Sequence, residues 1–463
     1  MSDPKRSAEP RDGSEPLGEG PEAAPGRSAT SRPLSRDFAA VRSRSEALCA
    51  HLGDEDLVAQ SMPDASPSKW HLAHTTWFFE TFVLAAFEKD HRPFHEAFGF
   101  LFNSYYNAAG ERHARPIRGV LTRPTRREVM AYRQAVDEAV VSLLDSDALS
   151  GDARQQAENI VRLGLHHEQQ HQELTLTDIK HLFSLNALAP AYRDALPVNE
   201  AFAPDFGWLA FDAGVREIGA GGPSPLAGER LWHDAAPFAF DNEGPRHRVF
   251  VEAHALGDRL VTNAEYLAFI EDGGYDTASL WLDRGWATVQ REGWRHPFYW
   301  REAEGGFREF TLAGLRDFAP HEPVSHLSLF EADAFARWAG ARLPTEAEWE
   351  SAASALGACG SLADVDRFHP DVAPAHAPGA PRRMRQAFGD VWEWTSSSYG
   401  PYPGFSPTAG ALGEYNGKFM CEQTVLRGAS CATSRSHVRP SYRNFFYAPD
   451  RWQLSGVRLA KDQ

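Results

Sequence analysis

Two histidines stand four residues apart in the segment His167-Glu-Gln-Gln-His171. On a helix such residues project from one face, and Ile160 and Leu174, seven residues to either side of His167, turn that face towards an apolar interior. His74, in an earlier segment, offers a third imidazole from across a helical bundle. Three neutral imidazoles suit Zn, Fe or Cu about equally, so the spacing predicts a metal site of His74, His167 and His171 without naming the ion.

The same pair fits the zinc-protease pattern H-E-x-x-H, in which Glu168 would be the general base. The longer protease motif is incomplete, because His171 is followed by Gln-Glu-Leu-Thr instead of a glycine and a third histidine. A more remote third ligand would have to come from around Glu200. A zinc hydrolase therefore stays open as an alternative.

Other groups capable of chemistry lie between the histidine segments. Tyr105 and Tyr106 are either packing residues or phenols that donate a proton or hydrogen atom beside an open metal position. Arg112, Arg115 and Arg118 recur every three residues, which is typical of a solvated basic face or of a clamp for a substrate carboxylate. Both sets are candidates for the site.

Helical patterns from about residue 36 to 187 would position these side chains. Apolar residues recur there at three- and four-residue steps, and several positions carry residue types that favour the start of a helix. We expect helices over 37–52, from Ser66-Pro67 with Ser66 as N-cap, from the capping box Thr125-x-x-Glu128, and from a cap at Asp152 to about Leu185. Four long amphipathic helices in one run predict a four-helix bundle.

Beyond about residue 205 the sequence changes to short apolar segments between Gly, Pro, Asn and Asp turns. Strands are expected at 206–211, 247–253, 425–428 and 456–459, and helices near 263–272 and 329–339. This mixture predicts an α+β multidomain chain. The expected organisation is a disordered tail at 1–35, a helical bundle at 36–190, a linker at 191–205 and an α+β domain at 206–463.

Composition narrows the class of protein. The formal net charge of −16 argues against nucleic-acid binding, which depends on Lys and Arg. No apolar run is long enough to span a bilayer, and the N-terminus lacks the apolar segment of a signal peptide. The four cysteines form no CxxC pair and are expected to be free thiols, with Cys421 and Cys431 able to meet only on neighbouring strands. We expect a cytoplasmic protein that binds small molecules and neither nucleic acid nor membrane, with its oligomeric state left open.

Several short motifs in a fixed order carry a family resemblance. They are Trp70-His-Leu-Ala-His74, His167-Glu-Gln-Gln-His171, Ala341-Arg-Leu-Pro-Thr-Glu-Ala-Glu-Trp349-Glu, Gly389-Asp-Val-Trp-Glu-Trp-Thr395, Val425-Leu-Arg-Gly-Ala-Ser430 and Gly456-Val-Arg-Leu459. Over about 36–463 the chain resembles the sulfoxide synthases of ergothioneine biosynthesis. The resemblance implies a DinB-like four-helix bundle followed by an α+β domain of the formylglycine-generating-enzyme or C-type-lectin-like type.

The resemblance also implies residue roles. The iron-binding histidines of the family fall on His74, His167 and His171, and the betaine hercynine binds Fe(II) through an imidazole nitrogen. Gln170 matches a glutamine that contacts hercynine, and Asn444 matches an asparagine near its carboxylate and trimethylammonium group. Phe445 and Phe446 follow Asn444 and are candidates to line the pocket of that cation, since aromatic faces attract quaternary ammonium groups.

The chain departs from one branch of the family in a way that bears on the thiol substrate. That branch has Asn-Trp-Asp where this chain has Asn444-Phe445-Phe446, and an arginine where it has Asp450. The missing charges would hold the glutamyl part of γ-glutamylcysteine. The sequence is therefore more similar to the branch that uses free cysteine.

The tyrosines favour the same branch. Its catalytic tyrosines lie in an Asn-Ser-Tyr-Tyr segment of the first domain, which Tyr105 and Tyr106 match. The other branch has its tyrosine in a second-domain loop that resembles 408–418, where Tyr415 is off register. We therefore expect Tyr105 or Tyr106 to be the proton or hydrogen donor.

The resemblance implies an iron-dependent oxidoreductase. It would use O2 to join cysteine to the imidazole C2 of hercynine, giving hercynylcysteine sulfoxide. Related substrate pairs stay open, namely γ-glutamylcysteine with hercynine, histidine with cysteine, or hercynine with a selenium donor. A binding module with a vestigial bundle is the non-enzymatic alternative.

Overall fold

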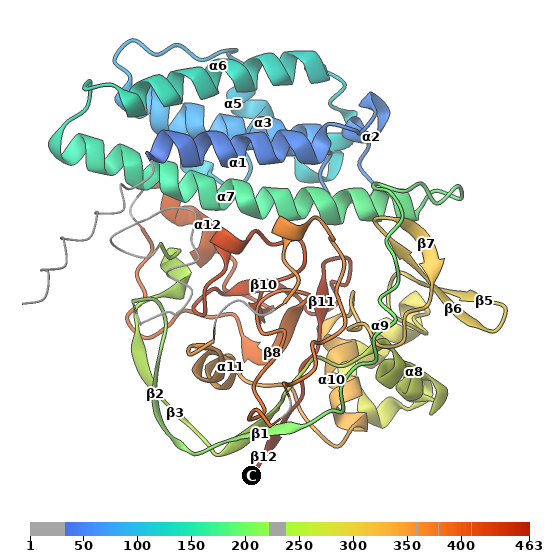
Figure 1. Ribbon diagram of the computed structural model, residues 1–463. Coiled ribbons are helices and arrows are strands. Elements are labelled where there is room, and N and C mark those ends of the chain that lie inside the picture. The colour runs from blue at the N-terminus through green and yellow to red at the C-terminus, as the bar shows by residue number, and fades with distance from the viewer. Residues whose placement is uncertain (1–32, 222–237, 357–359, 378, 409) are drawn as a thin grey trace, which may run out of the picture.

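The computed structural model describes residues 33–221, 238–356, 360–377, 379–408 and 410–463. They form a helical bundle and a strand-rich unit, with the longest helix of the bundle lying along the boundary between them (Figure 1). Residues 1–32 of the expected tail lie outside the described residues. The order of a helical bundle followed by an α+β unit is as the sequence predicts.

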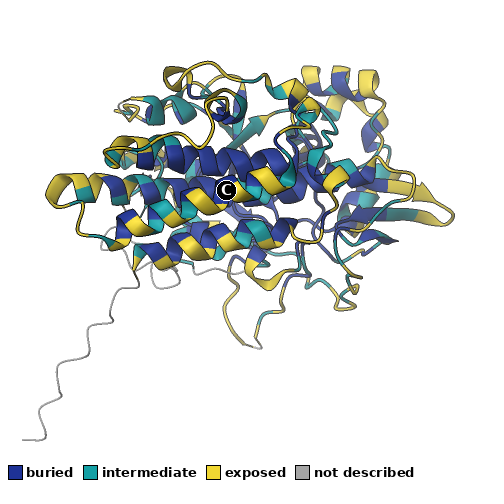
Figure 2. Ribbon diagram, turned by 90° about the horizontal axis from the view of Figure 1, so that it is seen from above, coloured by how far each residue is buried: buried dark blue, intermediate teal, exposed yellow. Residues whose placement is uncertain are grey.

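The bundle is built from four long helical stretches and several short helices. The long ones are α1 (Leu34–Cys49), α3 (Ser68–Phe79), α6 (Arg126–Asp145) and α7 (Gly151–Ser184). The chain continues from α3 through one π-helical stretch, Glu80–Leu84, into α4 (Ala85–Phe87). The shorter helices α2 (Asp54–Val58) and α5 (Phe98–Phe102) flank α3. α1 and α6 bury one side and expose the other, as an amphipathic pattern requires, whereas α3 is buried on all sides (Figure 2).

The start of α3 differs from the expected one. The helix begins at Ser68 with Pro67 as its N-cap, so Ser66 does not cap it. The Ser66 hydroxyl instead accepts a hydrogen bond from Arg118 Nη1 at 2.9 Å, and its N–H donates to Asp178 Oδ2 at 2.8 Å. Tertiary partners have therefore replaced the local cap.

The starts of α6 and α7 are close to their expected positions, and the helix expected at 37–52 spans Leu34–Cys49. At α6 the capping box of Thr125 and Glu128 is confirmed. α7 begins at Gly151 after the N-cap Ser150, two residues before the predicted cap at Asp152. Asp152 lies in the first turn instead of at the cap, where its charge still favours the helix dipole.

Within its described residues, the strand-rich unit holds four small sheets. Their orders are β1-β4-β12, β10-β9-β8-β11, β2-β3 and β5-β6-β7, and β11 is parallel to β8 while the other pairs are antiparallel. The strands are β1 (Trp208–Phe211), β2 (Gly214–Ile218), β3 (His247–Val251), β4 (His254–Gly257), β5 (Trp300–Ala303), β6 (Gly306–Thr311), β7 (Gly314–Asp317), β8 (Trp392–Ser398), β9 (Gln423–Gly428), β10 (Asn444–Tyr447), β11 (Ser455–Gly456) and β12 (Ala460–Asp462). The helices are α8 (Asn263–Glu271), α9 (Asp283–Glu292), α10 (Leu329–Trp338), α11 (Glu346–Ala353) and α12 (Glu414–Gly417).

The prediction of a strand at 456–459 is mostly wrong. β11 ends at Gly456 and β12 starts at Ala460, so residues 457–459 connect two sheets. Two main-chain hydrogen bonds hold this connection, from Val261 N to Val457 O at 3.1 Å and from Gly257 N to Leu459 O at 2.8 Å, and the Arg458 side chain adds further bonds to Glu393. The apolar alternation that predicts a strand here therefore reflects burial between sheets.

α7 joins the two units through buried polar contacts. Glu173 accepts hydrogen bonds from Trp392 Nε1 at 2.8 Å, from the Ser430 hydroxyl at 2.5 Å and from the Thr433 hydroxyl at 2.7 Å. One turn earlier, Gln169 donates to Ser436 at 2.6 Å. In the described part of the chain, no helix combines the length and apolar character that a membrane crossing requires.

Candidate metal centre and adjoining cavity

Three imidazoles meet inside the bundle, one from α3 and two from α7. His74 Nε2 lies 3.3 Å from His167 Nε2, and His171 Nε2 lies 3.1 Å from the same atom. The three inner nitrogens all lie within 4.8 Å of one another. The helical spacing of His167 and His171 and the crossing of α3 over α7 therefore bring together the donor set that the sequence predicts.

The protonation of these rings suits a metal. His74 Nδ1 lies 2.6 Å from Phe102 O, and because a carbonyl only accepts, Nδ1 carries the proton and leaves Nε2 free. Burial, and then the neighbouring His167, holds the pKa of His74 well below its usual range, and burial lowers the pKa of His167 to about 4. Burial likewise lowers the pKa of His171. Neutral imidazoles with converging free nitrogens are the form that metal ions bind.

A second cluster also brings potential ligand atoms within 4.8 Å, those of Glu309, Glu322 and His369. Two arginines share this cluster. Arg316 Nη2 donates to Glu309 Oε2 at 3.3 Å and also pairs with Glu322, and Arg367 Nη2 donates to Glu322 Oε1 at 3.0 Å. Two guanidinium groups thus match the two carboxylates, and we interpret the cluster as an ion-pair network.

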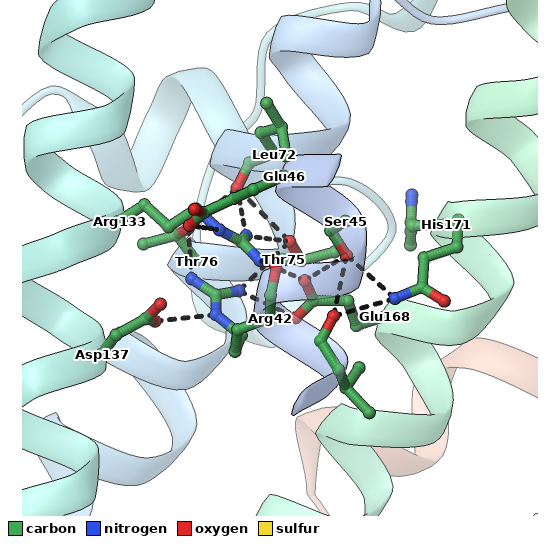
Figure 3. A network of polar contacts seen from close by, with 12 residues as sticks. Arg42, Ser45, Glu46, Leu72, Thr75, Thr76, Arg133, Asp137, Glu168 and His171 are labelled. Atoms are coloured by element: carbon green, nitrogen blue, oxygen red, sulfur yellow. Dashed lines mark hydrogen bonds and ion pairs between the residues drawn. The ribbon is translucent and has the colours of Figure 1, made fainter. Parts of the chain in front are cut away.

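Glu168, the base of the zinc-hydrolase alternative, points away from the three histidines. Its carboxylate accepts hydrogen bonds from Arg42 Nη1 at 2.8 Å, from Arg133 Nη2 at 2.5 Å and from the Ser45 hydroxyl at 2.6 Å. Figure 3 shows these contacts converging on Glu168 while His171 stands apart. Burial opposes ionisation, but Arg133 and Arg42 outweigh it and lower the pKa of Glu168 to about 2. A fully buried carboxylate held by two arginines cannot take a proton from a metal-bound water, which argues against the hydrolase.

A cavity of about 200 Å³ adjoins the histidines, and both units form its walls. His74 and His171 line it from the bundle, as do Tyr105 and Tyr106. Tyr106 is buried and its ring lies 5.7 Å from the ring of Trp77, while the Tyr105 hydroxyl accepts a hydrogen bond from Arg115 Nη1 at 2.6 Å. The two phenols therefore have different surroundings, one apolar and one beside a cation.

The three arginines of the predicted clamp separate in the structure. Arg115 and Arg118 line the cavity, whereas Arg112 is exposed and donates to Ser104 O at 2.7 Å. The Arg118 guanidinium stacks on Trp70 at 3.3 Å, and Trp70 stacks on His74 with ring centres 4.6 Å apart. Burial, and then the charge of Arg115, lowers the pKa of Arg118 to about 9. Two adjacent cations on a cavity wall would be stabilised by an anionic ligand.

The other predicted residues also line the cavity, Gln170 from α7 and the rest from β10. Gln170 Nε2 donates to the Tyr442 hydroxyl at 2.7 Å, and Asn444, Phe445 and Phe446 lie on β10 at the cavity. Phe445 stacks on Tyr399 with ring centres 4.1 Å apart. Phe445, Phe446, Tyr442 and Trp452 make this part of the lining mainly aromatic.

Tyr415, although off register with the tyrosine of the other branch, lies at the site. Tyr415, on α12, stacks on Tyr106 with ring centres 6.5 Å apart, and its ring lies 6.4 Å from that of His167. Its position within 408–418, the segment similar to the tyrosine-bearing loop of the other branch, is the sequence feature that indicates a place at the site. The cysteine pair finds no support, since Cys421 is exposed, Cys431 is buried and both are free thiols.

Comparisons with known proteins agree with this architecture. A family model described as DinB superfamily matches residues 37–174, and one described as sulfatase-modifying factor enzyme 1-like domain matches residues 220–463. The hercynine oxygenase of Mycolicibacterium smegmatis is 33% identical over 455 residues, which cover 93% of this chain and 98% of the relative. That of Mycolicibacterium thermoresistibile is 34% identical, with 93% and 94% covered.

A more distant relative is similar over part of its length. Ergothioneine biosynthesis protein 1 of Schizosaccharomyces pombe is 26% identical over 238 residues, which cover 49% of this chain and 28% of the relative. The two Mycolicibacterium relatives, in contrast, match this chain almost from end to end. The chain therefore belongs to the hercynine oxygenase family of sulfoxide synthases, which are oxygen-using enzymes.

Proposed function

We propose that this protein is an Fe(II)-dependent enzyme that joins the sulfur of free cysteine to the imidazole C2 of hercynine. The products would be hercynylcysteine sulfoxide and water. O2 would accept four electrons, two from forming the C–S bond and two from oxidising sulfur, and one oxygen atom would remain on the sulfoxide. The observation that carries the proposal is the convergence of three imidazole nitrogens beside a cavity with a cationic wall and an aromatic wall.

His74, His167 and His171 are the residues that would hold the ion. Bound Fe(II) would supply the redox chemistry for O2 and leave positions open for substrates. The pairing of Glu168 with two arginines supports an oxygenase over a zinc hydrolase, because the base of the hydrolase is missing.

The aromatic wall suits hercynine. Its trimethylammonium group cannot donate a hydrogen bond and is attracted to aromatic faces, which Phe445 and Phe446 offer. Asn444 stands beside them, and Gln170, one residue before a histidine of the metal site, can contact the imidazole portion. All the residues that the family resemblance assigns to hercynine are among those that line this cavity, which supports the proposal.

The cationic wall suits a small amino acid. Arg115 and Arg118 can bind the carboxylate of cysteine, and the guanidinium fork is well matched to it. Asp450 lies at the same cavity, and burial raises its pKa to about 7. A second carboxylate, such as that of a γ-glutamyl group, would have to be desolvated beside Asp450, so we favour free cysteine as the thiol.

An aerobic assay with Fe(II) and hercynine tests the substrates directly. We expect the sulfoxide mass with cysteine to exceed that with γ-glutamylcysteine, because Asp450 disfavours the extra carboxylate. Product should be absent without O2 and with Zn(II) in place of Fe(II). A clear preference for the dipeptide would contradict the assignment of the thiol, and product formed without O2 would contradict the oxygenase.

Replacement of Tyr106 with phenylalanine should divert the reaction. Without a phenol as proton or hydrogen donor, C–S bond formation should fall by about 10²-fold or more, and cysteine sulfinate should become the main product. Mass analysis of both products at equal enzyme and Fe(II) loading measures the ratio. Matched Tyr105→Phe and Tyr415→Phe variants identify which of the three neighbouring phenols acts. Full sulfoxide synthesis by the Tyr105→Phe/Tyr106→Phe double variant would exclude both residues of the predicted pair.

A further inference from the structure

The outer nitrogens of the metal-site histidines have different partners. His74 Nδ1 donates to a main-chain carbonyl, that of Phe102. His171 Nδ1 instead lies 2.8 Å from Nδ1 of a fourth histidine, His71. Since Nδ1 and Nε2 are on opposite sides of the ring, His71 lies behind His171 and not among the three converging nitrogens.

A buried carboxylate completes this arrangement. His71 Nε2 lies 3.0 Å from Asp178 Oδ2, and the same oxygen accepts the main-chain N–H of Ser66 at 2.8 Å. The side chains of His71 and Asp178 are 4% and 6% exposed, so solvent cannot easily replace either contact. Asp178 follows His171 by seven residues on α7, which puts both on one face of the helix, and His71 bridges them from α3.

The direction of each hydrogen bond follows from the groups involved. A main-chain N–H only donates, so Asp178 Oδ2 is an acceptor, and His71 Nε2 therefore donates its proton to it. In a neutral imidazole the other nitrogen is then free, so His71 Nδ1 accepts the proton of His171 Nδ1. His171 Nε2 is left without a proton on the side that faces His74 and His167. If both hydrogen bonds ran in the opposite direction, His171 Nε2 would carry a proton and could not bind a metal.

We propose that Asp178 and His71 are positioning residues that set the tautomer and orientation of His171 as a metal ligand. The inference rests on the proposed function in one respect, that the three histidines hold a metal. A carboxylate behind an imidazole also makes its free nitrogen a stronger electron-pair donor to a metal. Outer partners of this kind commonly affect metal affinity. The metal centre thus has one ligand fixed by a carbonyl and another fixed by a histidine and a carboxylate.

Metal affinity of the full chain tests the proposal without reference to turnover. Co(II) is titrated into metal-free protein against a competing chelating dye, and thermal unfolding of the metal-free forms is measured in parallel. His71→Leu and Asp178→Leu should each weaken binding by about 10- to 100-fold, the usual cost of losing an outer partner. Asp178→Asn should recover much of that loss, because an amide oxygen can still accept from Ser66 N and His71 Nε2.

His181→Leu is the matched control. His181 is a buried histidine on the same helix, and its Nδ1 lies 2.7 Å from the Ser61 hydroxyl. The substitution therefore removes a comparable imidazole away from the three ligands and should leave Co(II) affinity within about twofold.

Three outcomes separate the possibilities. Equal affinity of the parent and both Leu variants would overturn the positioning role while leaving the metal site intact. Equal loss in His181→Leu and His71→Leu would also overturn it, because the effect would then be one of packing. A parent protein that binds no Co(II) at these histidines would contradict the proposed function itself.

Discussion

Replacement of His167 with alanine should abolish stoichiometric Fe(II) binding and, with it, O2-dependent product formation. His167 Nε2 lies within 3.3 Å of both other inner nitrogens, so its loss removes the middle member of the donor set. The effect should exceed the about 10- to 100-fold that loss of an outer partner costs, since a ligand is removed and not merely its support. Metal analysis after anaerobic loading, followed by product formation per enzyme, measures both losses.

A histidine elsewhere on α7 provides the comparison for that experiment. His181→Ala deletes a buried imidazole ten residues beyond His171 and should bind Fe(II) with the stoichiometry of the parent. If His167→Ala keeps full metal content and turnover, the three histidines are not the metal site and the proposed function is wrong. A loss shared equally by His181→Ala would instead indicate a general disturbance of the helix.

Glu168→Gln should lower the free energy of unfolding by about 3–5 kcal/mol, the usual cost of removing one partner of a buried ion pair. The carboxylate is 0% exposed and is the common acceptor for Arg42 and Arg133, whose side chains are 2% and 0% exposed. The amide would leave two buried guanidinium groups with less compensating charge. Chemical denaturation of the parent and the variant at neutral pH measures the difference.

The pH dependence of that difference has a defined sign. The pKa of Glu168 falls from 4.5, its usual value, to about 2 in the folded protein. The carboxylate therefore stabilises the fold fully above about pH 4.5, and this contribution is lost as the pH falls towards 2. The gap between parent and Glu168→Gln should be constant above that window and narrow within it. A gap that widens on acidification would contradict the ion-pair interpretation.

Glu173→Gln is the matched substitution on the same helix. Glu173 is also buried, but its partners are neutral hydroxyl and indole groups, and burial raises its pKa. Its amide would leave no charged group unpaired, so the cost should be about 1–2 kcal/mol, that of one or two hydrogen bonds. Equal costs at 168 and 173 would mean that the arginines are not what makes Glu168 important.

The predictable part of the site is the part that sequence spacing determines. His167 and His171 are four residues apart on one helix, so a helical pattern alone places them together. The apolar faces of the helices predict that His74 points into the same interior, and the two units follow from a change in hydrophobic periodicity near residue 205. The formal possibility that Glu168 is a base also follows from spacing, and only its distant arginine partners exclude it.

The unpredictable part depends on contacts between distant segments. Tyr415 reaches Tyr106 from more than 300 residues further along the chain, and local sequence gives no reason for α12 to pack there. Serine is a residue type that often caps a helix, yet the hydroxyl of Ser66 bonds Arg118 and its main-chain N–H bonds Asp178. In both cases tertiary packing outweighs the local pattern, and such packing cannot be read from spacing.

Seven consecutive residues of α7 divide their side chains among four neighbours. His167 and His171 meet the imidazole of His74 on α3, and Glu168 and Gln172 bond α1. Glu168 also bonds Arg133 on α6, and Gln169, Gln170 and Glu173 bond the strand-rich unit. Each step along a helix turns about 100°, so deleting one residue just before this stretch would move every side chain to the wrong neighbour. Insertions and deletions here should therefore be far more damaging than single replacements. The rotation of α7 about its own axis, more than any single residue on it, therefore determines whether the histidine cluster, the Glu168 ion pairs and the contacts with the strand-rich unit can form together.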